Sequence, residues 1–301
     1  MTFKLHIRGA CVGAGILLSA GCASHAPPRV DHNAQTVARD SLEVYIGKLR
    51  RLSIAAAPKR PQVVTIETEN PELRAALQAL TAGATPSRHL RVANAYRLAG
   101  VLDLAYDYYV AARDLDRHDA AAYDGLARIW RDWSVPHLGL GDARRAIYYA
   151  PTSAAAYNTF GTLLHALGQT AEARRAFERA LALDPRAAYA WTNLCYQSFE
   201  AGDLHAATAN CRRALALNPG LAAAHNDLAL VYAAAGDLSS AEREFSAAGA
   251  DEAARHYNVG IVLSAGRRYV DAAQSFDAAH KLHPGWTNAA DRARQARRLA
   301  E

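Results

Sequence analysis

The chain of 301 residues has few aromatic side chains, only 8% of the total. β-Branched residues are also sparse, whereas alanine is the dominant residue and leucine is common. Because alanine and leucine favour helices, this composition predicts an all-α protein. The 19 glycines and 11 prolines recur at regular points instead of in clusters, which argues against long disordered tracts.

The sequence also lacks the common signatures of catalysis and of cofactor binding. It contains no Gly-x-Ser-x-Gly, no Walker sequence and no dinucleotide fingerprint. His165, His205 and His225 fall in different expected helices, and none has a second histidine four residues away, so a zinc site is unsupported. We therefore expect no metal, no cofactor, no small-molecule substrate and no enzymatic activity.

The one compact apolar run near the N-terminus is too short to span a membrane. Lys4 and Arg8 precede it, and residues 10–18 carry no charge. The sequence "LSAGC" follows at residues 18–22. A positive start, a short apolar run and small residues before a cleavage point predict a secretory signal.

The cysteine directly after Ala-Gly makes this segment resemble the signal peptide of bacterial lipoproteins. The resemblance implies that residues 1–21 are removed and that Cys22 carries the lipid; an ordinary signal peptide cut near Ala20 or Ala23 is the alternative. The next two residues lack the aspartate that favours inner-membrane retention, so the implied location is the periplasmic face of the outer membrane. Residues 22–32 are polar and contain proline, as expected of a flexible tether.

The charge balance argues against a nucleic-acid partner. Removal of residues 1–21 takes away Lys4 and Arg8 and no acid, which lowers the formal net charge from +5 to +3. A charge of this size, spread over such a long chain, is not the footprint of a nucleic-acid-binding protein.

A repeat of 34 residues runs through most of the chain. "RALALDP" at 179–185 and "RALALNP" at 213–219 are 34 residues apart, and Pro151 lies 34 residues before Pro185. Small and large apolar residues recur at helical spacing around these prolines, which predicts two helices per repeat. The repeats are expected at 86–119, 120–153, 154–187, 188–221, 222–252 and 253–286.

This pattern resembles the tetratricopeptide repeat family. The resemblance implies a right-handed α-solenoid of about six helical hairpins, followed by a capping helix at 287–301. A helical extension is expected at 33–85, in which Asn70 caps a helix that begins at Pro71 and stops at Gly83.

The family resemblance also implies a concave groove, lined by the first helix of each repeat, in which a partner peptide or helix binds. The outward positions expected to contact this partner are Asp124, Arg128, Arg131, Asn158, Thr162, His165, Thr192, Tyr196, Phe199, Asn226, Leu230 and Tyr257. Tyr196 and Phe199 are expected as aromatic anchors. Packing of Phe199 under the next repeat is the alternative.

Cys195 and Cys211 each lie eight residues from Asp203, which marks the turn of their hairpin. Equal spacing puts the two cysteines at the same height in an antiparallel pair of helices, and export places them in an oxidising compartment. We predict a disulfide, with two buried thiols as the alternative.

Together these features predict a lipid-anchored periplasmic scaffold that docks protein partners while an envelope machine, such as a pilus or secretion apparatus, is assembled. A binding module for an exported polysaccharide or cell-wall component is the main alternative. An unrecognised enzyme is the third hypothesis.

Overall fold

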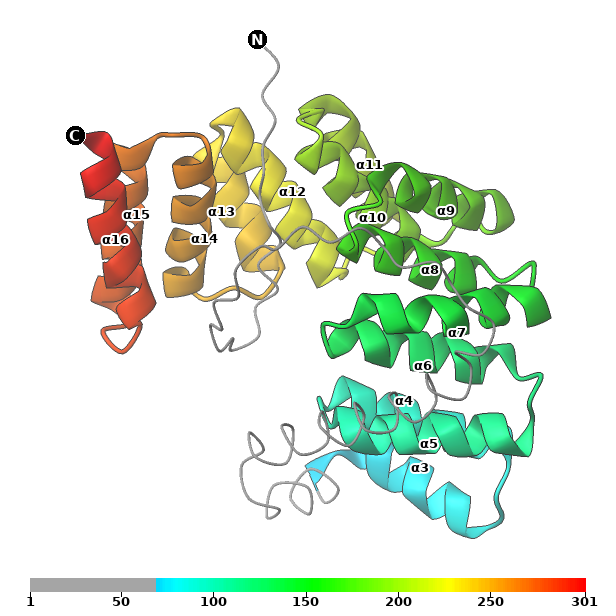
Figure 1. Cartoon of the computed structure of the whole chain (residues 1–301). Helices are drawn as coiled ribbons and strands as arrows, with labels where there is room; N and C mark the ends of the chain where they lie inside the picture. The colour runs from blue at the N-terminus through cyan, green and yellow to red at the C-terminus, as the bar shows by residue number, and fades with distance from the viewer. Residues whose placement is uncertain (1–68) are drawn as a thin grey trace, which may run out of the picture. The chain divides into compact units, whose positions relative to one another are not determined.

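The structure is a computed structural model that describes residues 69–301, and this part of the chain contains helices and short connections but no strand (Figure 1). The predictions for the signal segment, Cys22, the tether at 22–32 and residues 33–68 lie outside the described residues. The all-α prediction is confirmed for the rest.

The helices fall into two compact units, the first ending at Arg117 and the second beginning at His118. The first unit contains α3 (Pro71–Thr81), α4 (Pro86–Leu98) and α5 (Leu102–Leu115). As expected, Asn70 caps α3, because its Oδ1 accepts a hydrogen bond of 3.0 Å from the backbone N–H of Leu73. Gly83, with a φ of 134°, follows the end of α3.

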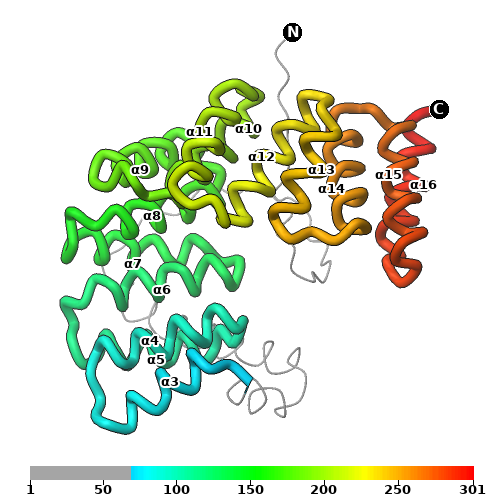
Figure 2. Tube along the Cα trace, turned by 180° about the vertical axis from the view of Figure 1, so that it is seen from behind, coloured from blue at the N-terminus to red at the C-terminus, as the bar shows by residue number. Residues whose placement is uncertain are grey.

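The second unit contains five helical hairpins and a last single helix. Its helices are α6 (Ala120–Asp132), α7 (Pro136–Tyr149), α8 (Ala154–Ala166), α9 (Thr170–Leu183), α10 (Ala188–Glu200), α11 (Leu204–Leu217), α12 (Ala222–Ala235), α13 (Leu238–Ala247), α14 (Glu252–Ala265), α15 (Tyr269–Leu282) and α16 (Thr287–Ala300). Each expected repeat range contains one pair of helices, except that α14 begins at Glu252, one residue before the range 253–286. In Figure 2 the trace doubles back between the two helices of each pair.

The two helices of a hairpin are separated by a turn in which one position has a positive φ. Four repeats place glycine there: Gly100, Gly168, Gly202 and Gly236, with φ between 75° and 87°. Glycine adopts this conformation without steric strain, which explains its recurrence. Ser134 and Arg267, with φ of 63° and 59°, occupy the same position in the other two repeats.

The start of a repeat is also built the same way in successive hairpins. The ring Nε1–H of Trp191 donates a hydrogen bond of 3.1 Å to the carbonyl of Pro185. His225 occupies the place of Trp191 in the next repeat, and Pro219 occupies the place of Pro185. Nε2 of His225 lies 2.8 Å from the carbonyl of Pro219. A ring nitrogen thus ties the first helix to the end of the preceding repeat.

The core of the second unit lies between the helices of each hairpin and between neighbouring hairpins. Small residues on one helix receive large ones from the next, as where the ring of Phe177 on α9 lies against Gly161 on α8. Phe245 and Phe276 are buried in the same way further along the chain. Helix α13 has only 10 residues, whereas α9, α11 and α15 have 14, so repeat 222–252 is short in its second helix.

Candidate interaction face on the first helices

The first helices of the five hairpins, α6, α8, α10, α12 and α14, form a row in which each contacts the next. Polar residues recur on this row at the repeat spacing. One series is Asp124, Asn158, Thr192 and Asn226, and a second is Thr159, Asn193 and Asp227. We call the side chains of these two series, together with those that contact them, the polar row.

The two series meet between neighbouring repeats. Nδ2 of Asn193 on α10 donates a hydrogen bond of 2.7 Å to Oδ1 of Asn158 on α8. Because amide side chains both donate and accept, such a pair leaves further donors and acceptors for a bound backbone.

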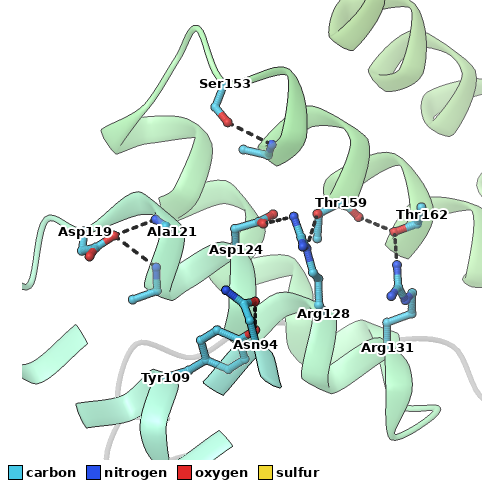
Figure 3. A network of polar contacts seen from close by, with 12 residues as sticks. Asn94, Tyr109, Asp119, Ala121, Asp124, Arg128, Arg131, Ser153, Thr159 and Thr162 are labelled. Atoms are coloured by element: carbon cyan, nitrogen blue, oxygen red, sulfur yellow. Dashed lines mark hydrogen bonds and ion pairs between the residues drawn. The ribbon is translucent and has the colours of Figure 1, made fainter. Parts of the chain in front are cut away.

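At the start of the polar row the side chains are charged and bonded to one another (Figure 3). Arg128 forms an ion pair with Asp124 one turn earlier on α6, and its Nε donates a hydrogen bond of 3.3 Å to Oγ1 of Thr159 on α8. Burial raises the pKa of Asp124, and the nearby Arg128 guanidinium opposes that shift. The acid therefore serves mainly to fix the arginine.

Arg131 repeats this arrangement one turn further along α6. Its Nη1 donates a hydrogen bond of 3.2 Å to Oγ1 of Thr162 on α8, and its Nη2 lies 2.9 Å from Oδ1 of Asp132. The hydroxyl of Thr162 in turn donates to the carbonyl of Thr159 (Figure 3). Two arginines of one repeat are thus held against two threonines of the next.

The middle of the polar row carries a histidine, an acid and a tyrosine. Nε2 of His165 on α8 lies 3.4 Å from Oε2 of Glu200 on α10, and the ring of Tyr196 meets the His165 ring edge-on at 5.7 Å. Burial raises the pKa of Glu200, while His165 and a hydrogen bond from Tyr196 lower it. These groups form one connected polar cluster between α8 and α10.

Asp227 on α12 differs from the other members of its series because no described residue forms an ion pair or hydrogen bond with its side chain. Thr192, a member of the first series, has a partner within its own helix: its hydroxyl donates a hydrogen bond of 3.0 Å to the carbonyl of Ala188 on α10. Burial raises the pKa of Asp227 to about 7. Thr159, Asn193 and Asp227 are not among the residues predicted to contact a partner, although their spacing by one full repeat relates them to one another.

Two residues expected to face a partner are buried instead. Phe199 is 2% exposed and packs with Cys195, Cys211, Leu228 and Val231, so its prediction as an aromatic anchor is wrong. It lies at the seam between α10 and α12, where an apolar ring turns into the core. Thr192 is 6% exposed and hydrogen-bonded within its own helix, so it does not present its hydroxyl either.

The remaining expected contacts lie toward the C-terminal end of the row. Asn226 and Leu230 on α12 are half-buried, and Leu230 packs against the apolar clusters on both of its sides. The hydroxyl of Tyr257 on α14 accepts a hydrogen bond of 3.0 Å from Nε of Arg292, and its ring packs against Phe276. This end of the row is therefore apolar and aromatic.

The predicted disulfide partners face each other across the hairpin of α10 and α11. The Cα atoms of Cys195 and Cys211 are 5.2 Å apart, and their sulfur atoms lie at bonding distance. This Cα spacing lies within the range that a disulfide requires. Both residues are fully buried, so the pair belongs to the core beneath the polar row.

In the part of the chain from residue 69 onward, no group of three or more His, Cys, Asp or Glu side chains is arranged to hold a metal ion. No helix in that same part combines the length and the apolar character that a membrane span requires.

Two sequence profiles described as tetratricopeptide repeat match residues 154–187 and 198–258. No curated protein sequence matches the chain. The matched segments are similar to tetratricopeptide repeats, and the described residues fold as an all-α solenoid of that type, a fold that serves protein–protein interaction.

Solved structures share this fold at low sequence identity. The Cut9–Hcn1 structure of the APC/C matches with a TM-score of 0.64 and 17% identity, over 77% of this chain and 47% of that one. This chain thus spans less than half the length of that match.

Two further structures match over nearly their whole length. PilF of Pseudomonas aeruginosa has a TM-score of 0.53 and 18% identity, over 68% of this chain and 95% of its own. PilW, described as a widely conserved type IV pilus biogenesis factor, has a TM-score of 0.56 and 23% identity, over 66% of this chain and 94% of its own. At these identities the likeness shows the fold alone.

Proposed function

We propose that this protein is a lipid-anchored scaffold on the periplasmic face of the outer membrane, which docks protein partners during assembly of an envelope machine. The observation that carries the proposal is the polar row, in which side chains from consecutive repeats are linked across α6, α8 and α10. A row of preorganised donors and acceptors on rigid helices suits an extended or helical peptide, because little side-chain freedom is lost on binding.

The chemistry of the row predicts the character of the partner segment. The start of the row presents Arg128 and Arg131, the middle presents amides and Tyr196, and the end presents Leu230 and Tyr257. A segment that carries an acidic part followed by an apolar part would complement this order. The fold likeness to PilF and PilW supports a pilus or secretion apparatus as the machine.

Site-specific photo-crosslinking in cells of the source organism tests the docking part of the proposal. A photoreactive residue at Tyr196 should capture a pilus or secretion assembly protein. The same residue at Glu178, an exposed position on the second helix α9, is the matched control and should not capture it. Equal capture at the two positions, or affinity for glycans without any protein partner, would contradict the proposal.

The anchor is tested separately from the docking face. Metabolic labelling with an alkyne fatty acid should label the full chain, and Cys22→Ser should abolish both the label and the recovery of the protein in the membrane fraction. An unlabelled, freely soluble wild-type protein would contradict the anchor and leave the docking result unaffected.

A further inference from the structure

One acidic side chain of the polar row, Asp227 on α12, reaches the surface without a partner. The residue is half-buried, and within residues 69–301 no side chain or backbone group forms an ion pair or a hydrogen bond with its carboxyl group. Burial raises its pKa to about 7, and no nearby cation opposes that shift. A carboxylate that has lost hydration and gained no contact raises the free energy of the folded state. Its charge therefore does not serve the fold and is available to a ligand.

The earlier members of the same series, Thr159 and Asn193, show where such a residue finds its partner. Thr159 accepts a hydrogen bond of 3.3 Å from Arg128, which stands 31 residues earlier on the preceding first helix (Figure 3). Asn193 is bonded at 2.7 Å to Asn158, which stands 35 residues earlier on the preceding first helix. The repeat thus offers two places for a partner, 31 and 35 residues before the member of the series.

Before Asp227, both of these places hold side chains that donate elsewhere. Tyr196 stands 31 residues earlier, so a phenol takes the place of the guanidinium, and its hydrogen bond goes to Glu200. Thr192 stands 35 residues earlier, and its hydroxyl donates to the carbonyl of Ala188. A hydroxyl has a single hydrogen to donate. The described helices therefore supply Asp227 with neither a cation nor a donor at the places where the repeat would provide one.

The neighbours of Asp227 on α12 suit the stem of a long side chain. Leu230 follows one turn later and is half-buried, and Ala223 precedes Asp227 by one turn and is exposed. Residues three and four apart share one face of a helix, so these apolar groups flank the carboxyl group along the polar row. Lysine and arginine combine an aliphatic stem with a terminal cation, and they can lay the stem on apolar groups while the cation reaches an acid.

We propose that Asp227 determines the specificity of the polar row by binding a lysine or arginine side chain of the partner segment, whose aliphatic stem lies along Leu230. A segment without this cation would leave the carboxylate buried and unpaired, so Asp227 also selects against such segments. The inference rests on the proposed role in docking proteins and deepens it. It places a basic residue between the acidic part of the segment, which faces Arg128 and Arg131, and its apolar part.

Random dodecapeptides displayed on phage, selected on the full chain purified in detergent, test this inference. The selected peptides should share one lysine or arginine at a constant distance from an acidic residue. Replacing that basic residue by methionine keeps an unbranched stem and removes the charge, and it should weaken binding at least tenfold in fluorescence polarisation. On Asp227→Asn, the same replacement should weaken binding less than twofold, because the carboxylate that selects the cation is gone.

A matched variant separates this contact from the overall charge of the protein. Glu242→Gln removes one negative charge from an exposed position on α13 in the same repeat, and it should keep the tenfold preference for the basic peptide. Asp227→Asn preserves the size of the side chain and removes an unpaired buried charge, so the variant should fold at least as stably as the wild type in thermal melts. Selection on Asp227→Arg should yield peptides with Asp or Glu in place of the basic residue.

Crosslinking from Tyr196 in cells extends the test to the natural partner: Asp227→Arg should lower the capture at least tenfold, and Glu242→Arg should not. An equal loss from the methionine replacement on wild type and Asp227→Asn would assign the basic residue to another acid and overturn the inference. Selected peptides without a basic residue, or a library without any binder, would overturn it too. Capture that persists in Asp227→Arg refutes the role of Asp227 and leaves the docking function standing, whereas no capture in the wild type refutes the docking function itself.

Discussion

Gly161→Ala is the substitution for which the structure gives the clearest energetic expectation. Gly161 lies in α8, and a Cβ atom built there would be 2.5 Å from Cε1 and 2.7 Å from Cδ1 of Phe177. Real Cβ contacts are not that short, so either the ring or the helix must move. Phe177 is 1% exposed and packed on all sides, so its ring has no free space to enter.

Two opposing terms decide the size of the effect. Alanine favours the helix over glycine by about 1 kcal/mol, whereas overpacking a well-packed core costs about 1–3 kcal/mol. Because the overlap involves two ring atoms and the ring is enclosed, we expect a cost near the upper end of that range. The difference between the two terms is a net loss of about 1–2 kcal/mol in the free energy of unfolding.

Gly141→Ala is the matched control in the neighbouring repeat. Gly141 lies inside α7, is exposed, and would bring its Cβ within 4 Å of nothing. There the helix propensity acts alone, so the same substitution should stabilise the protein by about 0.5–1 kcal/mol. The two variants should therefore differ in sign.

Urea unfolding followed by circular dichroism measures both variants, and amide hydrogen exchange resolves α8 and α9, because repeat proteins need not unfold in one step. Exchange in these two helices should be about tenfold faster in Gly161→Ala. Adding Phe177→Leu should relieve the overlap, so the two substitutions together should be less harmful than the sum of their separate effects. A stabilised Gly161→Ala protein, or strictly additive effects, would refute this account.

Three further measurements test individual side chains. The protein purified without reductant should be two hydrogens lighter than its reduced form because of a Cys195–Cys211 bond, and reduction should lower its free energy of unfolding by about 3 kcal/mol. Reaction of both thiols with iodoacetamide in unreduced, unfolded protein would disprove the bond. Burial opposes the charged form of His225, but its hydrogen bonds to Glu244 and a carbonyl outweigh this and raise its pKa. That stabilisation is complete below the unfolded pKa and is lost as pH rises through the folded pKa, so Glu244→Gln should destabilise the protein at pH 6 and much less at pH 9, in thermal melts. The raised pKa of Asp227, about 7, means that its contribution to stability falls as pH rises from about 4 to about 7. Asp227→Asn should therefore stabilise the protein at pH 8 by on the order of 1–2 kcal/mol, and an unchanged melt at pH 8 would disprove the burial argument.

The helix boundaries were predictable because the signals for them are local and repeated. Each hairpin turn has glycine or another residue with positive φ at one fixed place. Between hairpins, capping residues mark helix starts: Asn70, Asp119 and Ser153 directly precede α3, α6 and α8. Asp119 accepts hydrogen bonds of 2.8 Å and 3.3 Å from the N–H groups of the first turn of α6 (Figure 3). Six copies of one period give the pattern a redundancy that no single helix offers.

The fate of individual groove positions could not be predicted in the same way. Arg131, His165, Phe199 and Ala233 occupy equivalent places in four consecutive repeats, yet the first two are half-buried and the last two are buried. The place lies at the seam between neighbouring first helices, where a long polar side chain can reach the surface and an apolar one packs inward. Whether the side chain at this place is exposed or buried depends on the residues of the next repeat. The spacing within one repeat therefore does not predict its burial.

A pocket of about 350 Å³ at the C-terminal ends of α10, α12 and α14 arises from the same dependence between neighbours. A repeat with a short second helix and two alanines at the end of its first helix looks like a weak copy of the consensus when it is read alone. Placed between α10 and α14, the same alanines border a pocket that Leu204 and Arg268 also line. A departure from the repeat pattern is therefore a reason to examine the two neighbouring repeats, because the packing at the end of one first helix depends on the side chains of the next.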